Sequence, residues 1–198
     1  MESSEVKRSS RDVILSETIR LFSERGYSST SMRDIANAVG LLPGSLYVHI
    51  SGKEQLLGDI VESGIDRFLA ACKPALESDE PADVRMRAAM RAHMQIVGED
   101  AEHMLVALHQ WKYLTGDRLE IVVNKRREYE AIFTTIVGDG IKSGDFSKDI
   151  NPRIAVLTII GTLNWTPEWF SPEGPESAEQ VADEIADVLL CGLVRGPD

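Results

Sequence analysis

Cysteine is scarce in this chain, and long apolar runs are missing. The 198 residues include only two cysteines, Cys72 and Cys191, which are far apart and lack metal-ligand spacing. Two cysteines in a chain of this size do not form a disulfide framework. No run approaches the ~18 apolar residues of a membrane span, and the polar first residues lack the apolar core of a secretion signal. These absences predict a cytoplasmic protein that does not enter a membrane.

The common local signatures of catalysis are also missing. The sequence contains no nucleophile elbow, no phosphate-cradling glycine loop and no His-Glu-x-x-His pair. His93, His103 and His109 are spaced too irregularly to place two metal ligands one turn apart on a helix. We therefore predict that the chain is not an enzyme and has neither a cofactor nor a metal site. A metal sensor built from Asp100, Glu102 and His103 stays an alternative.

Strand patterns are absent too, because no segment alternates apolar and polar residues between turn pairs. Apolar residues recur instead at helical spacing between helix-start and helix-stop residues. The pattern predicts an all-α fold of about nine helices, with a three-helix N-terminal head and a helical C-terminal body. The predicted helices cover residues 13–25, 32–39, 43–50, 52–72, 83–98, 101–114, 117–143, 151–170 and 176–195.

The ends of the long fourth helix follow from a cap and a proline. Ser51 and Glu54 have the spacing of a capping box. Pro74 has no backbone N–H to donate, so we expect the helix to end just before it, at about Cys72. Residues 75–82 are then the clearest loop.

Charge is distributed unevenly along the chain. Residues 1–56 carry seven of the 21 Lys and Arg and seven of the 32 Asp and Glu, so residues 57–198 carry the whole net charge of −11. A neutral head on an acidic body fits a protein that presents only one end to a polyanion.

Two short predicted helices flank a turn that contains Gly40. The chain reverses there within a few residues, which requires a positive φ that glycine adopts at no steric cost. In the second short helix, Gly44 and Ser45 keep the exposed face small enough for a major groove, while Leu46 faces the core and Tyr47 faces outward. This spacing is typical of a helix-turn-helix.

The head carries a dense series of recognisable residues. The run T-x-M-R-D-I-A-x-x-x-G-x-x-x-G-S-L-Y-x-H begins at Thr30, and K-E-x-L-L begins at Lys53. Both resemble the DNA-binding head of the TetR/AcrR family of transcription regulators. The resemblance implies a helix-turn-helix DNA-binding domain over residues 1–56. It also implies an effector-binding and dimerisation domain over residues 57–198, whose last two helices pair with a second copy.

The resemblance further implies which side chains of the head meet DNA. Arg33 and Ser45 are expected at base edges, since arginine binds guanine bidentately. The other positions are expected to bind phosphates or a thymine methyl group. The predicted DNA-binding residues are Thr30, Arg33, Ser45, Tyr47, His49 and Lys53.

Methionine, tryptophan and a few polar residues recur through the middle of the body. An apolar cavity with a few convergent polar groups is the ordinary pattern of a ligand site, although a plain core uses the same apolar residues. We expect a pocket between the fifth and eighth helices. The predicted ligand-binding residues are His93, Val97, Met104, Leu108, Trp111, Phe133, Asn164 and Trp165.

A second resemblance lies in the stretch LNWTPEWFSPEGP. Its Asn164, Trp165 and Trp169 are similar to those of a TetR subgroup that responds to acyl-CoA thioesters or fatty acids. Glu168 departs from that subgroup, which often has a basic residue there, and a carboxylate repels the phosphates of CoA. The predicted effector is an acyl-CoA, a fatty acid or another lipophilic compound.

Together these patterns predict a ligand-responsive transcriptional repressor. It binds double-stranded operator DNA as a homodimer, and its effector favours a spacing of the two heads that no longer matches adjacent grooves. Two alternatives stay open: a metal-responsive regulator, and a helical interaction module without DNA binding.

Overall fold

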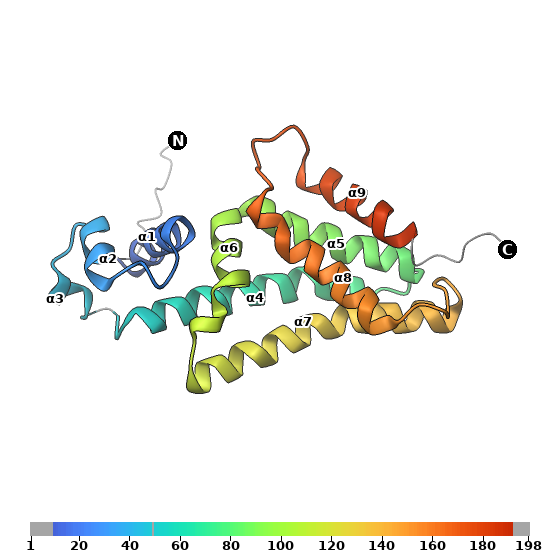
Figure 1. Cartoon of the computed structure of the whole chain (residues 1–198), viewed down its shortest axis with the longest axis horizontal. Helices are drawn as coiled ribbons and strands as arrows, with labels where there is room; N and C mark the ends of the chain where they lie inside the picture. The colour runs from blue at the N-terminus through green and yellow to red at the C-terminus, as the bar shows by residue number, and fades with distance from the viewer. Residues whose placement is uncertain (1–9, 49, 192–198) are drawn as a thin grey trace, which may run out of the picture.

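One long helix, α4, joins the two parts of the molecule. The computed structural model describes residues 10–48 and 50–191, and no strand occurs among them, so the all-α prediction is confirmed. In Figure 1 the short helices α1, α2 and α3 gather at one end of α4, and the remaining helices form the body. The elements are α1 (Ser10–Arg25), α2 (Met32–Ala38), α3 (Pro43–Leu46), α4 (Lys53–Glu77), α5 (Ala82–Glu99), α6 (Ala101–His109), η1 (Trp111–Tyr113), α7 (Gly116–Ser143), α8 (Pro152–Trp165), η2 (Thr166–Glu168) and α9 (Ala178–Cys191).

A capping box and two glycine turns shape the head. The Ser31 hydroxyl accepts a hydrogen bond from the Asp34 backbone N–H, and the Asp34 carboxylate accepts one from the Ser31 backbone N–H. This reciprocal pair satisfies two free donors at the start of α2. Gly26 and Gly40 have φ angles of 81° and 68°, which allow sharp reversals after α1 and after α2. The reversals bring α3 close behind α2, as a helix-turn-helix requires.

Helix α3 is shorter than predicted. It covers four residues rather than the eight of segment 43–50. Gly44 inside so short a segment weakens the helix, because glycine loses more backbone entropy on folding than any other residue. The predicted orientation is nevertheless present: Leu46 is fully buried, while Ser45 and Tyr47 are exposed.

Helix α4 departs from the prediction at its first turn. Gly52 is the N-cap, and no side chain caps the helix. Glu54 accepts hydrogen bonds from the backbone N–H and the hydroxyl of Thr115 instead, at 2.7 and 2.8 Å. The predicted capping box of Ser51 and Glu54 is therefore wrong, because the Glu54 carboxylate binds Thr115 rather than the backbone N–H of Ser51.

Helix α4 also runs through Pro74, where it was expected to end. Near its C-terminal end the Arg85 guanidinium donates to the backbone carbonyls of Ala75 and Leu76, at 3.1 and 2.9 Å. These bonds satisfy carbonyls that no residue of the last turn can reach. A side chain from α5 thus supports the extra helical turn that follows the proline.

Two hydrophobic cores meet along α4. Residues of its first half, up to Ile65, pack in the core of the head, whereas Phe68 and the residues after it pack in the core of the body. The predicted domain boundary at residue 56 therefore falls inside a continuous helix. Val106 of α6 also packs in the head core, so α6 contributes to both parts of the molecule.

Helices α4 and α6 approach each other closely at a glycine. A Cβ atom added at Gly64 would lie 2.5 Å from the Cβ of Ala107. Atoms at that distance overlap, so only glycine permits this approach.

Helix α8 is shorter than its predicted segment. Helix α8 ends at Trp165, and Pro167 lies in the 3₁₀ turn η2 that follows. Its start agrees with the cap signal, since the Asn151 side chain accepts from the backbone N–H of Arg153 and Ile154. Helix α9 begins at Ala178 and is described as far as Cys191, and the rest of its predicted range lies outside the described residues. None of the described helices has the length and apolarity to span a membrane.

Candidate functional site

The outer surface of the head presents three of the predicted DNA-binding side chains. Arg33, Ser45 and Tyr47 are all exposed. Leu42 and Val48 lie next to them in the sequence and are 77% and 81% exposed. The surface around α3 thus offers a guanidinium, two hydroxyls and apolar groups, which are the kinds of side chain that bind base edges and thymine methyl groups.

Two other predicted DNA-binding residues, Thr30 and Lys53, form hydrogen bonds in the turn between α1 and α2. Thr30 is 2% exposed, and its hydroxyl donates to the Gly26 carbonyl at 3.0 Å. The Lys53 ammonium donates to the carbonyls of Tyr27 and Thr30, both at 2.8 Å, and lies 4.1 Å from the centre of the Tyr27 ring. Partial burial lowers the pKa of Lys53. The side chain of His49 lies outside the described residues.

The body contains a small cavity between α4, α6, α7 and α8. Its volume is about 60 Å³. Two predicted ligand-binding residues, Leu108 and Asn164, line it. The cavity was expected between the fifth and eighth helices. Helices α6, α7 and α8 line it as expected, but α4 lines it in place of α5. The lining residues are Ile65, Phe68, Leu108, Arg126, Tyr129, Glu130, Ile160 and Asn164.

His93 lies behind the cavity wall and supports Tyr129. Its Nε2 is 3.1 Å from the Leu163 carbonyl, which can only accept, so Nε2 carries the proton. Nδ1 then accepts from the Tyr129 hydroxyl at 2.7 Å. Complete burial of the ring lowers the pKa of His93 from 6.5 to about 3, so the imidazole is neutral. His93 therefore orients Tyr129 from behind the wall and does not itself line the cavity.

The remaining predicted ligand-binding residues do not line the cavity. Val97, Met104 and Phe133 are fully buried in the body core. Trp111 stacks on the Arg126 guanidinium from η1, with 4.6 Å between the guanidinium carbon and the ring centre. Trp165 is 58% exposed, and its ring stacks on His109 rather than facing inward.

Arg126 and Asn164 are the two polar groups of the cavity that have unmet interactions. The Arg126 guanidinium stacks on Trp111 and forms no salt bridge with a described side chain. Burial lowers its pKa, and the nearby Glu130 carboxylate opposes that shift. The Asn164 Oδ1 atom is buried and has no hydrogen-bond partner, alone among buried side-chain nitrogen and oxygen atoms of the described residues. A buried polar atom without a partner costs about 1–3 kcal/mol, so it marks a place where a ligand or water is expected.

The sequence contains a pattern that indicates the wall of the cavity formed by α7. Val122, Arg126, Tyr129 and Phe133 recur at spacings of four, three and four, which places them on one face of a helix. Arg126 is also part of the Lys-Arg-Arg run at residues 125–127, and a charge run on a helix usually lies in solvent. Arg127 is exposed, whereas Lys125 and Arg126 are both half-buried, and Lys125 pairs with Asp66. Periodicity places Arg126 on the same helix face as Tyr129 and Phe133, which the composition of the run does not show.

The C-terminal end of α6 connects the cavity wall to the head. The His109 Nε2 lies 2.9 Å from the backbone carbonyl oxygen of Asn164 in α8. The His109 Nδ1 lies 3.1 Å from the Glu168 carboxylate. The next residue, Gln110, accepts a hydrogen bond from the Tyr27 N–H at 2.7 Å and donates to the Phe22 carbonyl at 2.8 Å. Adjacent residues of one short segment thus touch the cavity wall and the end of α1.

Two of the three residues of the alternative metal sensor, Asp100 and His103, bind other groups of the protein, and the third, Glu102, is exposed. The His103 Nε2 lies 2.8 Å from the Ile60 carbonyl, and its Nδ1 lies 3.5 Å from the Asp100 carboxylate. Among the described residues, no group of three or more histidine, cysteine or acidic side chains is arranged to hold a metal ion.

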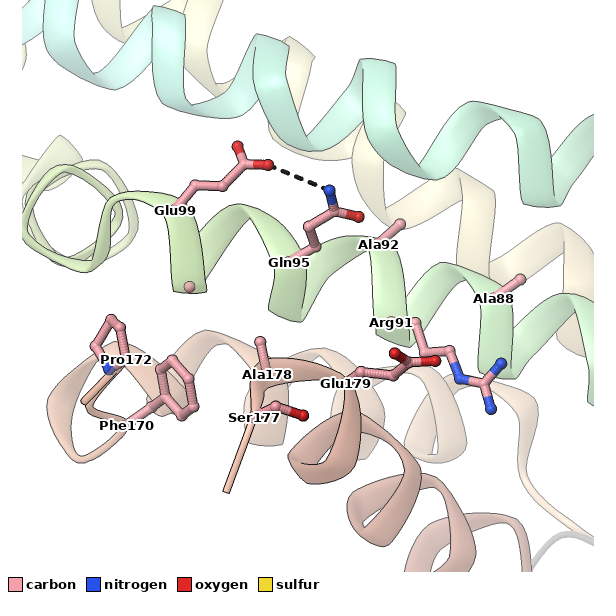
Figure 2. Close-up of a pocket in the computed structure, with 11 residues that line it drawn as sticks. Ala88, Arg91, Ala92, Gln95, Glu99, Phe170, Pro172, Ser177, Ala178 and Glu179 are labelled. Carbon is pink, nitrogen blue, oxygen red and sulfur yellow. Dashed lines mark hydrogen bonds between the residues drawn. The ribbon is translucent and has the colours of Figure 1, made fainter. Parts of the chain in front are cut away.

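A larger groove of about 760 Å³ lies on the outside of the body between α5 and the start of α9. Figure 2 shows Gln95 and Glu99 on one wall and Phe170, Ser177 and Glu179 on the other. Its one arginine, Arg91, already forms a bidentate pair with Asp183, at 2.6 and 2.9 Å. The guanidinium in this groove is therefore already paired within the protein.

The outer faces of α8 and α9 expose apolar side chains. Ile154, Leu157 and Val188 are 54%, 44% and 75% exposed. Ile154 and Leu189 line a groove of about 320 Å³ between the two helices. Apolar residues grouped in this way on a surface are typical of a protein–protein interface.

A helix-turn-helix head on a helical body with an inner cavity defines the class of DNA-binding transcription regulators. Two family models match the chain: "Bacterial regulatory proteins, tetR family" over residues 14–60, and "Tetracyclin repressor-like, C-terminal domain" over residues 79–193. The chain belongs to the TetR family of transcriptional repressors, which are regulators and not enzymes. Dimers and bound small molecules are typical of this family.

Individual relatives agree over nearly the whole chain. The transcriptional repressor KstR2 of Rhodococcus jostii is 28% identical over 190 residues, covering 94% of this chain and 92% of that protein. The structure of the TetR-family regulator PfmR from Thermus thermophilus superposes with a TM-score of 0.82 at 32% identity, covering 92% of this chain and 99% of that one. AibR in complex with isovaleryl coenzyme A and operator DNA superposes with a TM-score of 0.78 at 28% identity, covering 88% and 95%.

Proposed function

We propose that this chain is a ligand-responsive repressor that binds operator DNA through Arg33, Ser45 and Tyr47 and releases it when an effector enters the cavity of the body. The observation that carries the proposal is the junction of α6, where Gln110 binds the end of α1 and His109 binds the cavity wall. A small lipophilic or acyl-CoA-type effector is the class we expect, since AibR was solved with isovaleryl coenzyme A.

The proposed DNA contacts divide into reading and positioning groups. Arg33 is suited to a bidentate contact with guanine, and Ser45 and Tyr47 are suited to base edges or phosphates. Thr30 and Lys53 act by fixing the turn before α2, because their polar atoms already bind backbone carbonyls. His49 stays a proposed phosphate contact from the sequence pattern alone.

The proposed repressor works as a homodimer. Two heads are needed to bind half-sites about one helical turn of DNA apart. The exposed apolar residues of α8 and α9, including Leu157 and Val188, supply a surface that two copies can cover together.

The proposed release follows from the size of the cavity. Ligand sites commonly enclose about 300–1,000 Å³, whereas this cavity has a volume of about 60 Å³. An effector must therefore move the walls outward, and the wall formed by α6 carries Gln110 with it. Movement of Gln110 changes the position of α1, and so the spacing of two heads in a dimer.

A DNA selection followed by affinity measurements tests the proposal. The full-length protein is used to enrich fragments from a genomic library, and the enriched DNA is titrated at two salt concentrations. We expect specific binding that weakens steeply as salt rises, because phosphate contacts release counterions. Arg33→Ala should reduce affinity roughly 10- to 100-fold. Native mass spectrometry of the complex should show two protein chains per site.

Lys148→Ala is the matched control, since Lys148 is an exposed cation of the body. It should bind the selected DNA like the unmodified protein. If no fragment is enriched, or if both variants bind equally well, the DNA-binding role is wrong.

A further inference from the structure

Arg126 is a half-buried cation of the body that forms no salt bridge with a described side chain, although the nearby Glu130 carboxylate favours its charged form. It lines the cavity, and one face of its guanidinium stacks on Trp111. Removing an unpaired guanidinium from water is costly, unless a ligand supplies the opposite charge. A guanidinium stacked on one face still has its N–H edges free for planar, bidentate hydrogen bonding to a carboxylate.

Asn164 supplies a second polar group in the same cavity. Its Oδ1 atom has no partner. A half turn about the last side-chain torsion exchanges the positions of Oδ1 and Nδ2 at little cost, so the amide can donate from that position as well as accept. With Nδ2 in that position, Asn164 and Arg126 both donate to an anion between α7 and α8.

The charge of the cavity limits the ligand to a single negative group. Arg126 is the only cation in the lining, and Glu130 is a carboxylate in the same lining. The neighbouring cation Lys125 already pairs with Asp66. At the α6 end of the body, Glu168 pairs with His109. A CoA group carries several phosphate charges, whereas this region offers one cation without a salt bridge and at least two carboxylates. The carboxylates repel the phosphates, so the region disfavours CoA.

The remaining lining residues are apolar, so the body of the ligand must be apolar too. Ile65 and Phe68 of α4, Leu108 of α6 and Ile160 of α8 surround the space beside Arg126. Apolar ligand surface buried against them contributes about 25 cal/mol per Å².

We infer that the effector is a free, apolar monocarboxylic acid, whose carboxylate binds Arg126 and Asn164 and whose hydrocarbon part lies between α4, α6 and α8. The inference rests on the proposed function and narrows its effector class, because it favours the free acid over the CoA thioester of the same acyl chain. The acid must widen the cavity of about 60 Å³, and the displaced wall of α6 carries the signal.

Matched sets of ligands test this class with the full-length protein. The probes are hexanoate, octanoate, decanoate and 3-phenylpropanoate, each with the alcohol and the CoA thioester of the same carbon skeleton. Calorimetric titration gives the Kd of each probe. We expect at least one acid to bind more tightly than both its alcohol and its thioester.

Two neighbouring arginines on α7 provide the variants. Arg126→Gln should weaken binding of the acid roughly 10- to 100-fold, because charge-assisted hydrogen bonds are lost. Binding of the alcohol should be unchanged. Arg126→Lys keeps the charge and should recover part of the affinity. Arg127→Gln is the control, since Arg127 is exposed and donates to Asn124, and it should bind the acids like the unmodified protein.

Three results would overturn the inference: no probe acid binds, a thioester binds more tightly than its acid, or Arg126→Gln binds the acids as well as Arg127→Gln. Circular dichroism and the thermal midpoint establish that the variants are folded. Titrating the selected DNA with each probe separates this inference from the proposed function. Release of DNA by a thioester or an alcohol would leave the repressor intact and remove only the carboxylate class.

Discussion

The head and the body of this protein differ in how fully their polar groups are satisfied by hydrogen bonds and ion pairs. In the head, the polar groups around the turn after α1 are matched: Thr30 and Lys53 bind backbone carbonyls, and Gln110 closes the end of α1. In the body, a cavity remains, with Arg126 unpaired by any described group and one atom of Asn164 unsatisfied.

This difference indicates which part of the molecule can change its conformation. A packed core in which every hydrogen bond is made has one preferred arrangement, since any movement breaks contacts without replacing them. A cavity with unmet polar groups lowers the cost of moving its walls, because a ligand can supply the missing contacts. We therefore expect the head to move as a unit and the body to rearrange around a ligand. Three predictions test the structural basis of this comparison.

The largest expected effect lies at the crossing of α4 and α6. Gly64→Ala places a Cβ 2.5 Å from the Cβ of Ala107 and should lower the free energy of unfolding by about 3 kcal/mol. Denaturant titration measures the change. Gly138→Ala on α7 is the control, since a Cβ there meets no atom within 4 Å, and it should raise stability by about 0.5–1 kcal/mol. Equal behaviour of the two variants would show that the helices do not cross so closely.

The next effect is the pH dependence that His93 confers on stability. The unfolded histidine binds a proton below its pKa of 6.5, whereas the folded one stays neutral down to about 3. The unfolded state therefore binds more protons in this range, and stability falls as the pH decreases from 6.5 towards 3. Between about pH 7.5 and pH 5 the loss attributable to this group is roughly 2 kcal/mol.

Unfolding measured at the two pH values in His93→Gln isolates this contribution, because glutamine does not titrate. The variant should be less stable at neutral pH but should lose roughly 2 kcal/mol less on acidification. An unchanged pH slope would mean that the ring is protonated in the folded protein. That result would also remove the hydrogen bond to Tyr129 as we describe it.

The smallest effect is expected at the junction between the two parts. Gln110→Leu keeps the size of the side chain but removes its hydrogen bonds with Tyr27 N–H and the Phe22 carbonyl. The loss should be about 1–2 kcal/mol of stability, together with faster hydrogen exchange at the Tyr27 amide. The comparison variant is Gln95→Leu on α5, whose amide donates only to Glu99 on the same exposed face. If Tyr27 exchanges at the same rate in both, Gln110 does not join α6 to the head.

Local patterns were sufficient for the turns and the cap of the head, but not for the lining of the cavity. Gly26, Gly40 and Ser31 lie at the turns and cap that short-range rules assign to them. The lining of the cavity was found only in part, at Leu108 and Asn164. A periodic apolar face shows that a side chain is buried, but it does not show whether a neighbouring helix fills the space beside it.

Two errors in the helices have the same origin. Pro74 was expected to end α4, yet Arg85 of α5 binds the carbonyls of the turn that follows it. Glu54 was expected to cap its own helix, yet it binds Thr115 before α7. In both cases a partner from outside α4 outweighed a local preference of about 1–3 kcal/mol.

The sequence by itself determined the all-helical architecture, the glycine turns of the head and the family, because each depends on residues close together in the chain. Only the tertiary structure decided which polar side chains face a cavity, which ones hold the turn after α1, and how α6 touches both. Those outcomes depend on distances between segments that are remote in the sequence, and hydrophobic periodicity carries no information about such distances.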